Sequence, residues 1–387
     1  MMLEYSDHAG LSTSRELSRS GLQLGGGRKV TTISDVARVA GVSKSTVSRV
    51  LNDKPEVDAE MAQRVRQAVA SLGYRPSRLA RALRTQQSHV WALLVSDVRN
   101  AFYTEMVRGV EDLAYSAGYS VVLCNTDEDL EKEASYLELA LAERVGGIVL
   151  APTRSHAPHL SKVLASGTPV VTVNGHLDRY DVDRVLTNNA QGAWQAARHL
   201  VDGGYKYLAV ITGPAETTTG RERLAGFLAG AAARGRHIDP ALVRYGDYRE
   251  PGGRAEMRAL LSSPARPDAV FVANNEMTLG ALEAISETGL SIPDDIAVVG
   301  FDDMPWARLL NPPLTTVAQP TYDLGLETAR LLISRLDGYA GRAREVVLSP
   351  ELRVRASSAP RARADTSSSL ARNVDEPPST SVGSKSV

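Results

Sequence analysis

The segment 44–52 carries a one-sided set of hydrogen-bond donors and contains no acidic residue. Its donors are Lys44, Ser45, Thr46, Ser48, Arg49 and Asn52. Lys and Arg side chains can bond base edges in the major groove of DNA, and Ser, Thr and Asn can bond phosphate oxygens. In a helix over this segment, Lys44 and Ser45 occupy the first turn, which is the part that reaches base edges. The pattern favours a DNA-contacting surface over a merely solvated one.

Two short helices joined by a turn are predicted to position these donors. Thr32 and Asp35 have the spacing of a capping box, Gly41 can end the first helix, and Ser43 can cap the second. The expected inward stripes are Ile33, Val36, Ala37 and Ala40 in the first helix and Val47, Val50 and Leu51 in the second. A third helix over about 59–72 closes the small core. Residues 29–75 therefore predict an all-α helix-turn-helix module.

The charge along the chain agrees with a polyanion partner for one end only. Residues 28–84 contain 12 Lys and Arg against 5 acidic residues, whereas the whole chain has a formal net charge of −1. Residues 76–87 are predicted to be a linker that forms one short helix after Pro76 when DNA or a partner chain holds it, because so short a helix is marginal alone. Leu83 lies between Arg78 and Arg84 and is suited to a minor-groove wedge.

The long remainder, residues 88–356, predicts an α/β body. Eight short apolar segments, from Val90–Ser96 to Ile296–Phe301, alternate with amphipathic segments. This order is typical of parallel sheets with helices on both faces, joined by right-handed crossovers. About 270 residues exceed one such sheet, so we expect two sheets side by side. The cleft beyond the carboxyl ends of their strands is then the expected ligand site.

Residues 30–356 resemble the lactose/galactose-repressor family of bacterial transcription regulators. The resemblance is carried by Val30–Ala37, Ala40–Ser43, Thr46–Asn52, Leu72–Pro76 and Leu79–Arg84. It implies that Lys44, Ser45 and Arg49 read bases, that Asn52, Thr46 and Ser48 hold the DNA backbone, and that Leu83 enters the central step of a near-palindromic operator. The implied function is a sequence-specific transcriptional repressor whose operator affinity is controlled by a small-molecule effector, most simply a sugar or sugar derivative.

The resemblance also implies a body similar to periplasmic sugar-binding proteins, with two subdomains joined by three crossovers. We expect one subdomain from residues 88–188 and 320–356, the other from 189–313, and a crossover stretch at 314–319. The crossovers are expected near Asn188, within Asn311–Leu314 and near Ala318–Pro320.

Polar and aromatic residues stand where the expected strands end, and by family position they bind the effector. These candidates are Asn100, Phe102, Tyr103, Asn174, Arg223, Tyr248, Asn274, Asp302 and Gln319. Arg223 would donate hydrogen bonds to two hydroxyls or to a carboxylate, and Asp302 would accept hydrogen bonds from hydroxyls. Two alternatives remain open at this point: Arg223 and Asp302 form an ordinary ion pair, and the aromatic residues belong to the core. The family's usual Asn-Asp pair reads Asn274-Asn275 here, which weakens the expectation of a sugar.

Composition excludes several other classes. The single cysteine, Cys124, forbids an internal disulfide. The seven histidines do not have the spacing of metal ligands, so we expect neither a metal nor a cofactor. The motifs of nucleotide, zinc and serine-hydrolase sites are absent, so we expect no enzyme. No apolar run is long enough to cross a membrane, and no signal-peptide core is present, so a cytoplasmic protein is expected.

The two ends of the chain are predicted to be disordered, over residues 1–28 and 357–387. The second segment contains one leucine, Leu370, and cannot form a leucine-repeat helix that would make tetramers. Because a near-palindromic operator calls for two-fold symmetry, the expected assembly is a homodimer.

Overall fold

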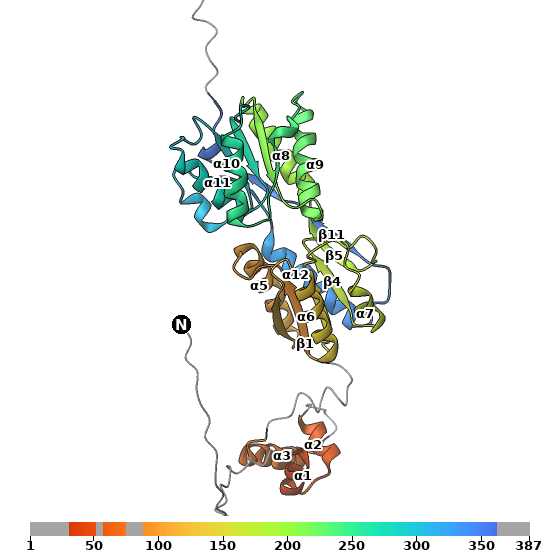
Figure 1. Cartoon of the computed structure of the whole chain (residues 1–387). Helices are drawn as coiled ribbons and strands as arrows, with labels where there is room; N and C mark the ends of the chain where they lie inside the picture. Colours follow the sequence, from red (N-terminus) through yellow and green to blue (C-terminus); the bar gives the residue numbers. More distant parts are fainter. Residues whose placement is uncertain (1–30, 52–56, 75–87, 362–387) are drawn as a thin grey trace, which may run out of the picture. The chain divides into compact units, whose positions relative to one another are not determined.

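The computed structural model describes residues 31–51, 57–74 and 88–361, in two units with a boundary between Thr85 and Gln86 (Figure 1). The predicted disordered extension over residues 1–28, the predicted linker over 76–87 and the last part of the predicted tail lie outside the described residues. Each unit is described by itself below.

The first unit is the predicted helix-turn-helix. Its helices are α1 (Ile33–Ala40), α2 (Lys44–Leu51) and α3 (Ala59–Leu72). The capping box is present, because Asp35 N donates to Thr32 Oγ1 at 3.4 Å and Thr32 N donates to Asp35 Oδ2 at 3.0 Å. Gly41 ends α1 with φ 65°, in the left-handed region. The three helices share one core that includes Val36, Val47 and Val65.

The first sheet of the second unit is entirely parallel and has the order β11-β5-β4-β3-β1-β2. Its strands are β1 (Val90–Val95), β2 (Ser120–Asn125), β3 (Gly147–Leu150), β4 (Val170–Val173), β5 (Asp183–Thr187) and β11 (Glu345–Leu348). The helices of this subdomain are α5 (Ala101–Ser116), α6 (Leu130–Ala142), α7 (Leu160–Ala165) and α12 (Thr321–Leu336).

The apolar run of β1 is explained by burial on both faces of this sheet. Trp91 and Leu93 join the core formed with α5 and α12, whereas Leu94 joins the core formed with α6 and α7. Successive side chains of a strand point to opposite faces, so a strand covered on both sides must be apolar throughout.

The second sheet has the order β12-β10-β9-β8-β6-β7 and is parallel except at β12. Its strands are β6 (Leu208–Thr212), β7 (Val243–Tyr245), β8 (Ala269–Val272), β9 (Ala297–Phe301), β10 (Thr315–Ala318) and β12 (Glu351–Arg353). Helices α8 (Asn189–Asp202), α9 (Thr218–Ala232), α10 (Glu250–Leu261) and α11 (Asn275–Glu287) accompany it, with short 3₁₀ turns η1 (Pro240–Leu242), η2 (Pro305–Arg308) and η3 (Ala356–Ser358). Within the described ranges, no helix combines the length and apolar character needed to cross a bilayer.

The chain passes three times between the two subdomains, but one expected crossover is wrong. The passages lie at Asn188, after β5, at Gln319–Pro320, after β10, and at Ser349–Pro350, between β11 and β12. The stretch 311–314 stays within the second subdomain, because Leu314 is buried in its core. The expected crossover stretch 314–319 is mostly β10, a strand of the second sheet. Passages of one or two residues have no composition that distinguishes them from other loops.

The residues after 350 belong to the second subdomain, which corrects two expected boundaries. Residues 351–356 were assigned to the first subdomain, yet β12 pairs antiparallel with β10. The tail was expected to be disordered from residue 357, yet Ser357 and Ser358 are buried and the described chain continues to residue 361. The serine hydroxyls explain the error, because they are consumed by internal hydrogen bonds: Ser357 Oγ donates to Val298 O at 2.7 Å.

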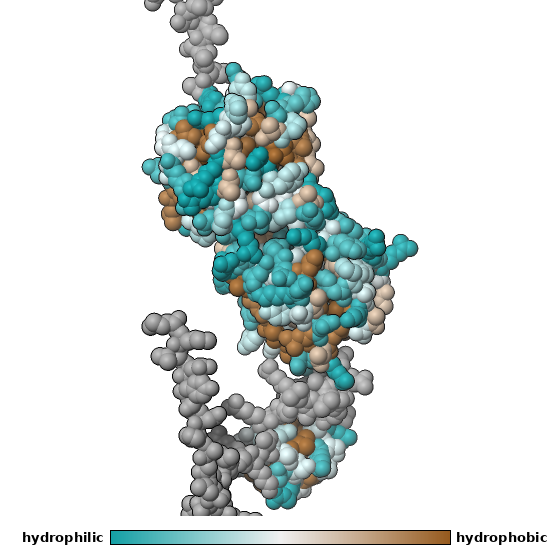
Figure 2. Space-filling model, in the orientation of Figure 1, coloured by the Kyte–Doolittle hydropathy of each residue, from teal (hydrophilic) through white to brown (hydrophobic). Residues whose placement is uncertain are grey.

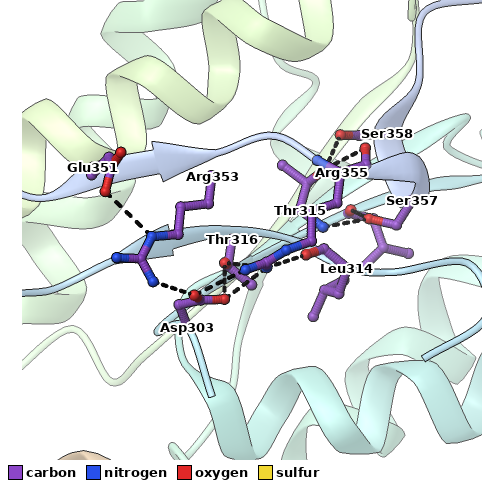
Figure 3. A network of polar contacts seen from close by, with 10 residues as sticks. Asp303, Leu314, Thr315, Thr316, Glu351, Arg353, Arg355, Ser357 and Ser358 are labelled. Carbon is purple, nitrogen blue, oxygen red and sulfur yellow. Dashed lines mark hydrogen bonds and ion pairs between the residues drawn. The ribbon is translucent and has the colours of Figure 1, made fainter. Parts of the chain in front are cut away.

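A buried carboxylate holds this last segment on the sheet (Figure 3). Asp303 Oδ1 and Oδ2 lie 2.7 and 3.0 Å from the two terminal nitrogens of Arg355, and Arg353 Nη1 donates to Oδ2 at 2.6 Å. Thr316 of β10 adds a hydroxyl hydrogen bond of 2.7 Å to Oδ1. Since Asp303 directly follows Asp302 in the chain, this network also fixes the backbone at one of the candidate ligand residues.

Replacing Asp303 with Asn is expected to lower the free energy of unfolding by about 2–3 kcal/mol at neutral pH, because it leaves the partly buried guanidinium group of Arg355, and the exposed one of Arg353, without this anion. Burial by itself raises the pKa of Asp303, but hydrogen bonds from Arg355, Thr316 and Arg353 outweigh it and lower the pKa from 3.8 to about 2. A depressed folded pKa contributes stability above the unfolded value, here about 2 kcal/mol, which is lost as the pH falls from about 4 towards 2.

Urea unfolding at pH 7 and pH 3 measures both effects of this substitution. Glu351→Gln is the matched control, because Glu351 contacts the same Arg353 at 3.3 Å but is exposed, and it should change stability by less than about 0.5 kcal/mol. Equal stability of wild type and Asp303→Asn at pH 7, or a difference between them that grows as the pH falls, would contradict this account.

Candidate functional site

The outward surface of α2 has the donor pattern that the sequence predicted. Val47 and Val50 are buried, whereas Lys44, Ser45 and Arg49 are exposed. Thr46 and Ser48 are half-buried at the margin of this surface. No acidic residue occurs in α2, so the whole exposed side of the helix presents positive charge and hydroxyl groups.

The first turn of α2 is organised by Ser43. Its Oγ accepts a hydrogen bond from Thr46 N at 3.1 Å and lies 2.7 Å from Ser45 Oγ and 2.8 Å from Thr46 Oγ1. The hydroxyl groups are thereby gathered at the amino end of the helix, where the dipole favours an anion such as a DNA phosphate. The other predicted DNA-contacting residues, Asn52, Arg78, Leu83 and Arg84, lie outside the described residues.

The second unit contains a cavity of about 450 Å³ between its two subdomains. Loops after β1, β2, β3 and β4 line it on one side, and loops and helix starts after β6, β7, β8 and β9 line it on the other. All nine residues predicted from strand ends are part of its lining: Asn100, Phe102, Tyr103, Asn174, Arg223, Tyr248, Asn274, Asp302 and Gln319. The cavity therefore lies at the carboxyl ends of both parallel sheets, where open α/β folds bind ligands.

Arg223 is a buried cation in the wall of the cavity. It is 3% exposed, its Nε donates to Asn189 Oδ1 at 2.8 Å, and its Nη1 donates to Ala273 O at 2.5 Å. Its guanidinium carbon lies 3.7 Å from the centre of the Phe301 ring, a cation–π contact. These contacts fix the plane of the Arg223 guanidinium group without a bound ligand.

Asp302 faces the same cavity but is no simple ion-pair partner of Arg223. Across the described residues, no nitrogen of Arg223 lies within 4.0 Å of an Asp302 oxygen, so the ordinary ion pair left open by the sequence does not form. Gln319 Nε2 donates to Oδ1 at 2.5 Å, and Asn275 N donates to Oδ2 at 3.3 Å. Burial raises the pKa of Asp302, and the nearby charge of Arg223 offsets part of the shift.

Tyr248 and Asn274 form one unit in the wall. Asn274 caps α11 through a 3.0 Å hydrogen bond from Met277 N, and its Nδ2 donates to Tyr248 O at 3.0 Å. The Tyr248 hydroxyl lies 2.7 Å from Thr219 Oγ1. Gly213 is required beneath it, because a Cβ there would stand 2.0 Å from Tyr248 Cζ. Asn274 thus acts in large part by positioning Tyr248.

Asn100 is committed to a contact across the cleft. Its Nδ2 donates to Asn275 Oδ1 at 3.1 Å, and Asn275 Nδ2 donates back to Asn100 Oδ1 at 3.0 Å. The same Oδ1 caps α5 by accepting from Phe102 N at 2.9 Å. The sequence predicts Asn100 as an effector ligand; the structure places it in the cavity lining and adds, through these bonds, a link between the two subdomains. Phe102 is 3% exposed and packs mainly in the core.

Both parts of the chain are similar to known protein families. Residues 32–77 match the family model for bacterial regulatory proteins of the lacI family, and residues 197–358 match a periplasmic binding protein-like domain. The ribose operon repressor of Escherichia coli (strain K12) is 38% identical over 328 residues, which cover 84% of this chain and 99% of that protein. The chain belongs to the lacI family.

Solved structures of other regulators share the fold of this lacI-family regulator. The Lac repressor dimer bound to operator and the anti-inducer ONPF has a TM-score of 0.77 and 30% identity, covering 86% of this chain and all of that one. A complex of the transcriptional regulator CelR with cellobiose has a TM-score of 0.65 and 34% identity, covering 84% of this chain and 99% of that one. The regulator is therefore a DNA-binding transcription factor with a periplasmic-binding-protein-like body.

Several cavity residues of the regulator were missed by the reasoning from its sequence. Thr217 and Thr219 flank the start of α9, Glu128 follows β2, and Arg154 and Arg249 come from loops after β3 and β7. The loop positions after predicted strands were a signal that could have found Glu128 and Arg249. Thr217 and Thr219 bear on the cavity through their contacts with the Tyr248 hydroxyl, which no local pattern announces.

Proposed function

We propose that this regulator is a repressor that binds a near-palindromic operator as a homodimer and responds to a sugar held in the cavity of its body. The observation that carries the proposal is the presence, in one chain, of an acid-free donor surface on α2 and a polar cavity enclosed by two subdomains. Such a protein acts where the chromosome is, so we place it in the cytoplasm.

The cavity offers the groups that a sugar requires. Arg223 presents a fixed fork, Asp302 and Glu128 present carboxylates, and Tyr103 and Tyr248 present rings and hydroxyl groups. Sugar hydroxyls both donate and accept, so a wall that alternates carboxylates with a guanidinium satisfies them. The ribose operon repressor and the cellobiose complex of CelR, both similar to this chain, support a sugar over other small molecules.

The ligand would act by linkage between the subdomains. Its hydroxyls would contact Arg223 and Asp302 of the second subdomain and Tyr103 and Asn174 of the first. Because the ligand touches both subdomains, its binding would favour one degree of closure between them. An effector changes operator affinity only by the difference in its affinity for the two states, which is typically worth about 1–3 kcal/mol. As a repressor ligand, the sugar is expected to favour the state with the lower operator affinity.

The homodimer has a candidate surface on the first subdomain. The apolar residues Val122 and Leu123 are exposed on β2, which is an edge strand of the first sheet. Leu139 of α6 and Tyr115 of α5 are exposed as well. Figure 2 shows apolar residues gathered on the surface of this subdomain in the region of α6. An exposed apolar edge strand is normally covered by a partner. Sedimentation equilibrium of the full chain measures the expected dimer.

The proposal is tested with the full chain and a near-palindromic site that the chain selects from random duplex DNA. Specific binding should exceed binding to unrelated duplex by about a thousandfold or more, and both should weaken steeply as salt rises. Titration with D-ribose, D-glucose and cellobiose should lower the affinity for the selected site. Binding that shows no preference for any sequence, or that no sugar alters, would contradict the proposed function.

A further inference from the structure

Glu128 occupies an unusual backbone position in the cavity wall. It lies in the turn between β2 and α6 with φ 62°, directly after Asp127 with φ 55°. Residues other than glycine rarely adopt the left-handed region, and such positions mark places where the surrounding structure imposes the conformation. Here Asp127 N donates to Ser96 O at 2.7 Å, which ties the turn to the end of β1. The turn therefore holds the Glu128 side chain at the cavity.

The carboxylate of Glu128 has lost much of its water without gaining a full set of donors. Its side chain is 25% exposed, the Ser96 hydroxyl hydrogen-bonds it, and Arg154 Nη1 lies 4.0 Å from Oε2, beyond hydrogen-bond distance. Ser96 in turn accepts from the Tyr103 hydroxyl at 3.1 Å. Burial raises the pKa of Glu128, which reflects this incomplete solvation. A hydroxyl of a bound ligand would supply the missing hydrogen bond.

The charges around the cavity favour ligands without an anionic group. The cavity is lined by six carboxylates, Asp97, Glu128, Asp247, Glu250, Glu276 and Asp302, and by four guanidinium groups, Arg99, Arg154, Arg223 and Arg249. Each guanidinium already donates to a protein oxygen, namely Asp97 Oδ2 for Arg99, Thr153 O for Arg154, Ala273 O for Arg223 and Asp127 O for Arg249. A phosphate ester carries a charge of about −2, and it would enter a cavity whose guanidinium groups already donate hydrogen bonds to protein oxygens.

We infer that Glu128 is a specificity-determining residue that accepts a hydroxyl of an unphosphorylated sugar and rejects the phosphate esters of the same sugar. The inference rests on the proposed function, since it concerns which sugars the cavity takes. Selection by charge rather than by size follows from the volume of about 450 Å³, which lies within the range of cavities that hold ligands larger than a sugar phosphate.

The test compares matched sugar pairs on the full chain by isothermal titration calorimetry. The pairs are D-ribose with D-ribose 5-phosphate and D-glucose with D-glucose 6-phosphate. For at least one pair, wild type should bind the neutral sugar at least a hundredfold more tightly than its ester. Glu128→Gln keeps the size of the side chain and removes its charge, so it should narrow this ratio tenfold or more. Glu131→Gln is the matched control, because Glu131 is exposed on α6 and does not line the cavity.

The outcomes separate this inference from the proposed function. Tighter or equal binding of a phosphate ester by wild type would overturn the inference and leave a sugar-responsive regulator intact. An unchanged ratio in Glu128→Gln, or an equal narrowing in Glu131→Gln, would also overturn it, because the selection would then come from elsewhere. Failure of both neutral sugars and both esters to bind wild type would overturn the inference together with the assignment of a sugar effector.

Discussion

Replacing Arg49 with Ala is expected to lower the affinity of the full chain for its operator about a thousandfold. Arg49 is exposed on α2, and a well-placed arginine contact to a base or phosphate is worth about 1–3 kcal/mol. A homodimer on a near-palindromic site loses this contact in both half-sites. A loss of about 2 kcal/mol in each half-site adds to about 4 kcal/mol, which is about a thousandfold in affinity. Electrophoretic mobility shifts at fixed salt on the selected site measure it.

Arg38→Ala is the matched control for this substitution. Arg38 lies in the same module on α1, is exposed and pairs with Asp35 at 3.0 Å, so its loss removes one positive charge without touching α2. It should reduce operator binding less than tenfold. Sugar binding by Arg49→Ala should equal that of wild type, because α2 and the cavity belong to separate units. A parallel fall in sugar affinity, or equal losses of operator affinity in both variants, would contradict the assignment of α2 as the reading helix.

Replacing Arg223 with Ala is expected to leave an operator-binding protein that no longer responds to sugar. Removing the charged hydrogen bonds of Arg223 to a ligand costs about 1–3 kcal/mol or more, which is roughly ten- to a hundredfold in affinity. Since Arg223 also donates to Asn189 and Ala273, Arg223→Lys serves as the second variant. It keeps the charge and loses the planar fork, and sugar affinity should still fall at least tenfold.

Arg221→Ala provides the control for these two variants, because Arg221 lies on the same helix α9, is exposed and does not line the cavity. Calorimetric titration with the sugar that binds wild type gives the affinities, and thermal unfolding monitored by circular dichroism shows whether each variant is folded. If folded Arg223→Ala and Arg223→Lys respond at the sugar concentration that suffices for wild type, the cavity is not the effector site. If only Arg223→Ala unfolds and Arg223→Lys keeps full sugar affinity, Arg223 has a structural role alone.

Local patterns in the sequence reached far into both functional regions. The capping box at Thr32 and Asp35, the glycine at position 41 and the apolar spacing of α2 predicted the helix-turn-helix, because each depends on residues within one or two turns of each other. The cavity lining could be predicted at Asn174, Asn274 and Asp302 for a related reason. Parallel strands bring their carboxyl ends to one edge, so recognising where an apolar strand ends is enough to place the next residue near the ligand.

The strands that the sequence did not predict share a physical cause. β5, β10, β11 and β12 are three to five residues long, and β11 and β12 alternate exposed and half-buried positions rather than forming apolar runs. Their existence depends on pairing with strands distant in the sequence, as β12 with β10 and β11 with β5. For the same reason the sequence does not predict the third passage at Ser349–Pro350, and it does not distinguish residues 357–361 from a disordered tail.

The sequence by itself determined an acid-free donor surface on α2 and a cavity at the carboxyl ends of two largely parallel sheets, because these features follow from residue types at short, regular spacing. Only the tertiary structure decided how individual side chains are used. Asn100 lines the cavity as predicted and also forms an amide pair with Asn275, which stands 175 residues away in the sequence. Glu128 became part of the wall because its turn is tied to Ser96. Such pairings depend on distances between chain segments that meet only after folding, and no local pattern specifies them.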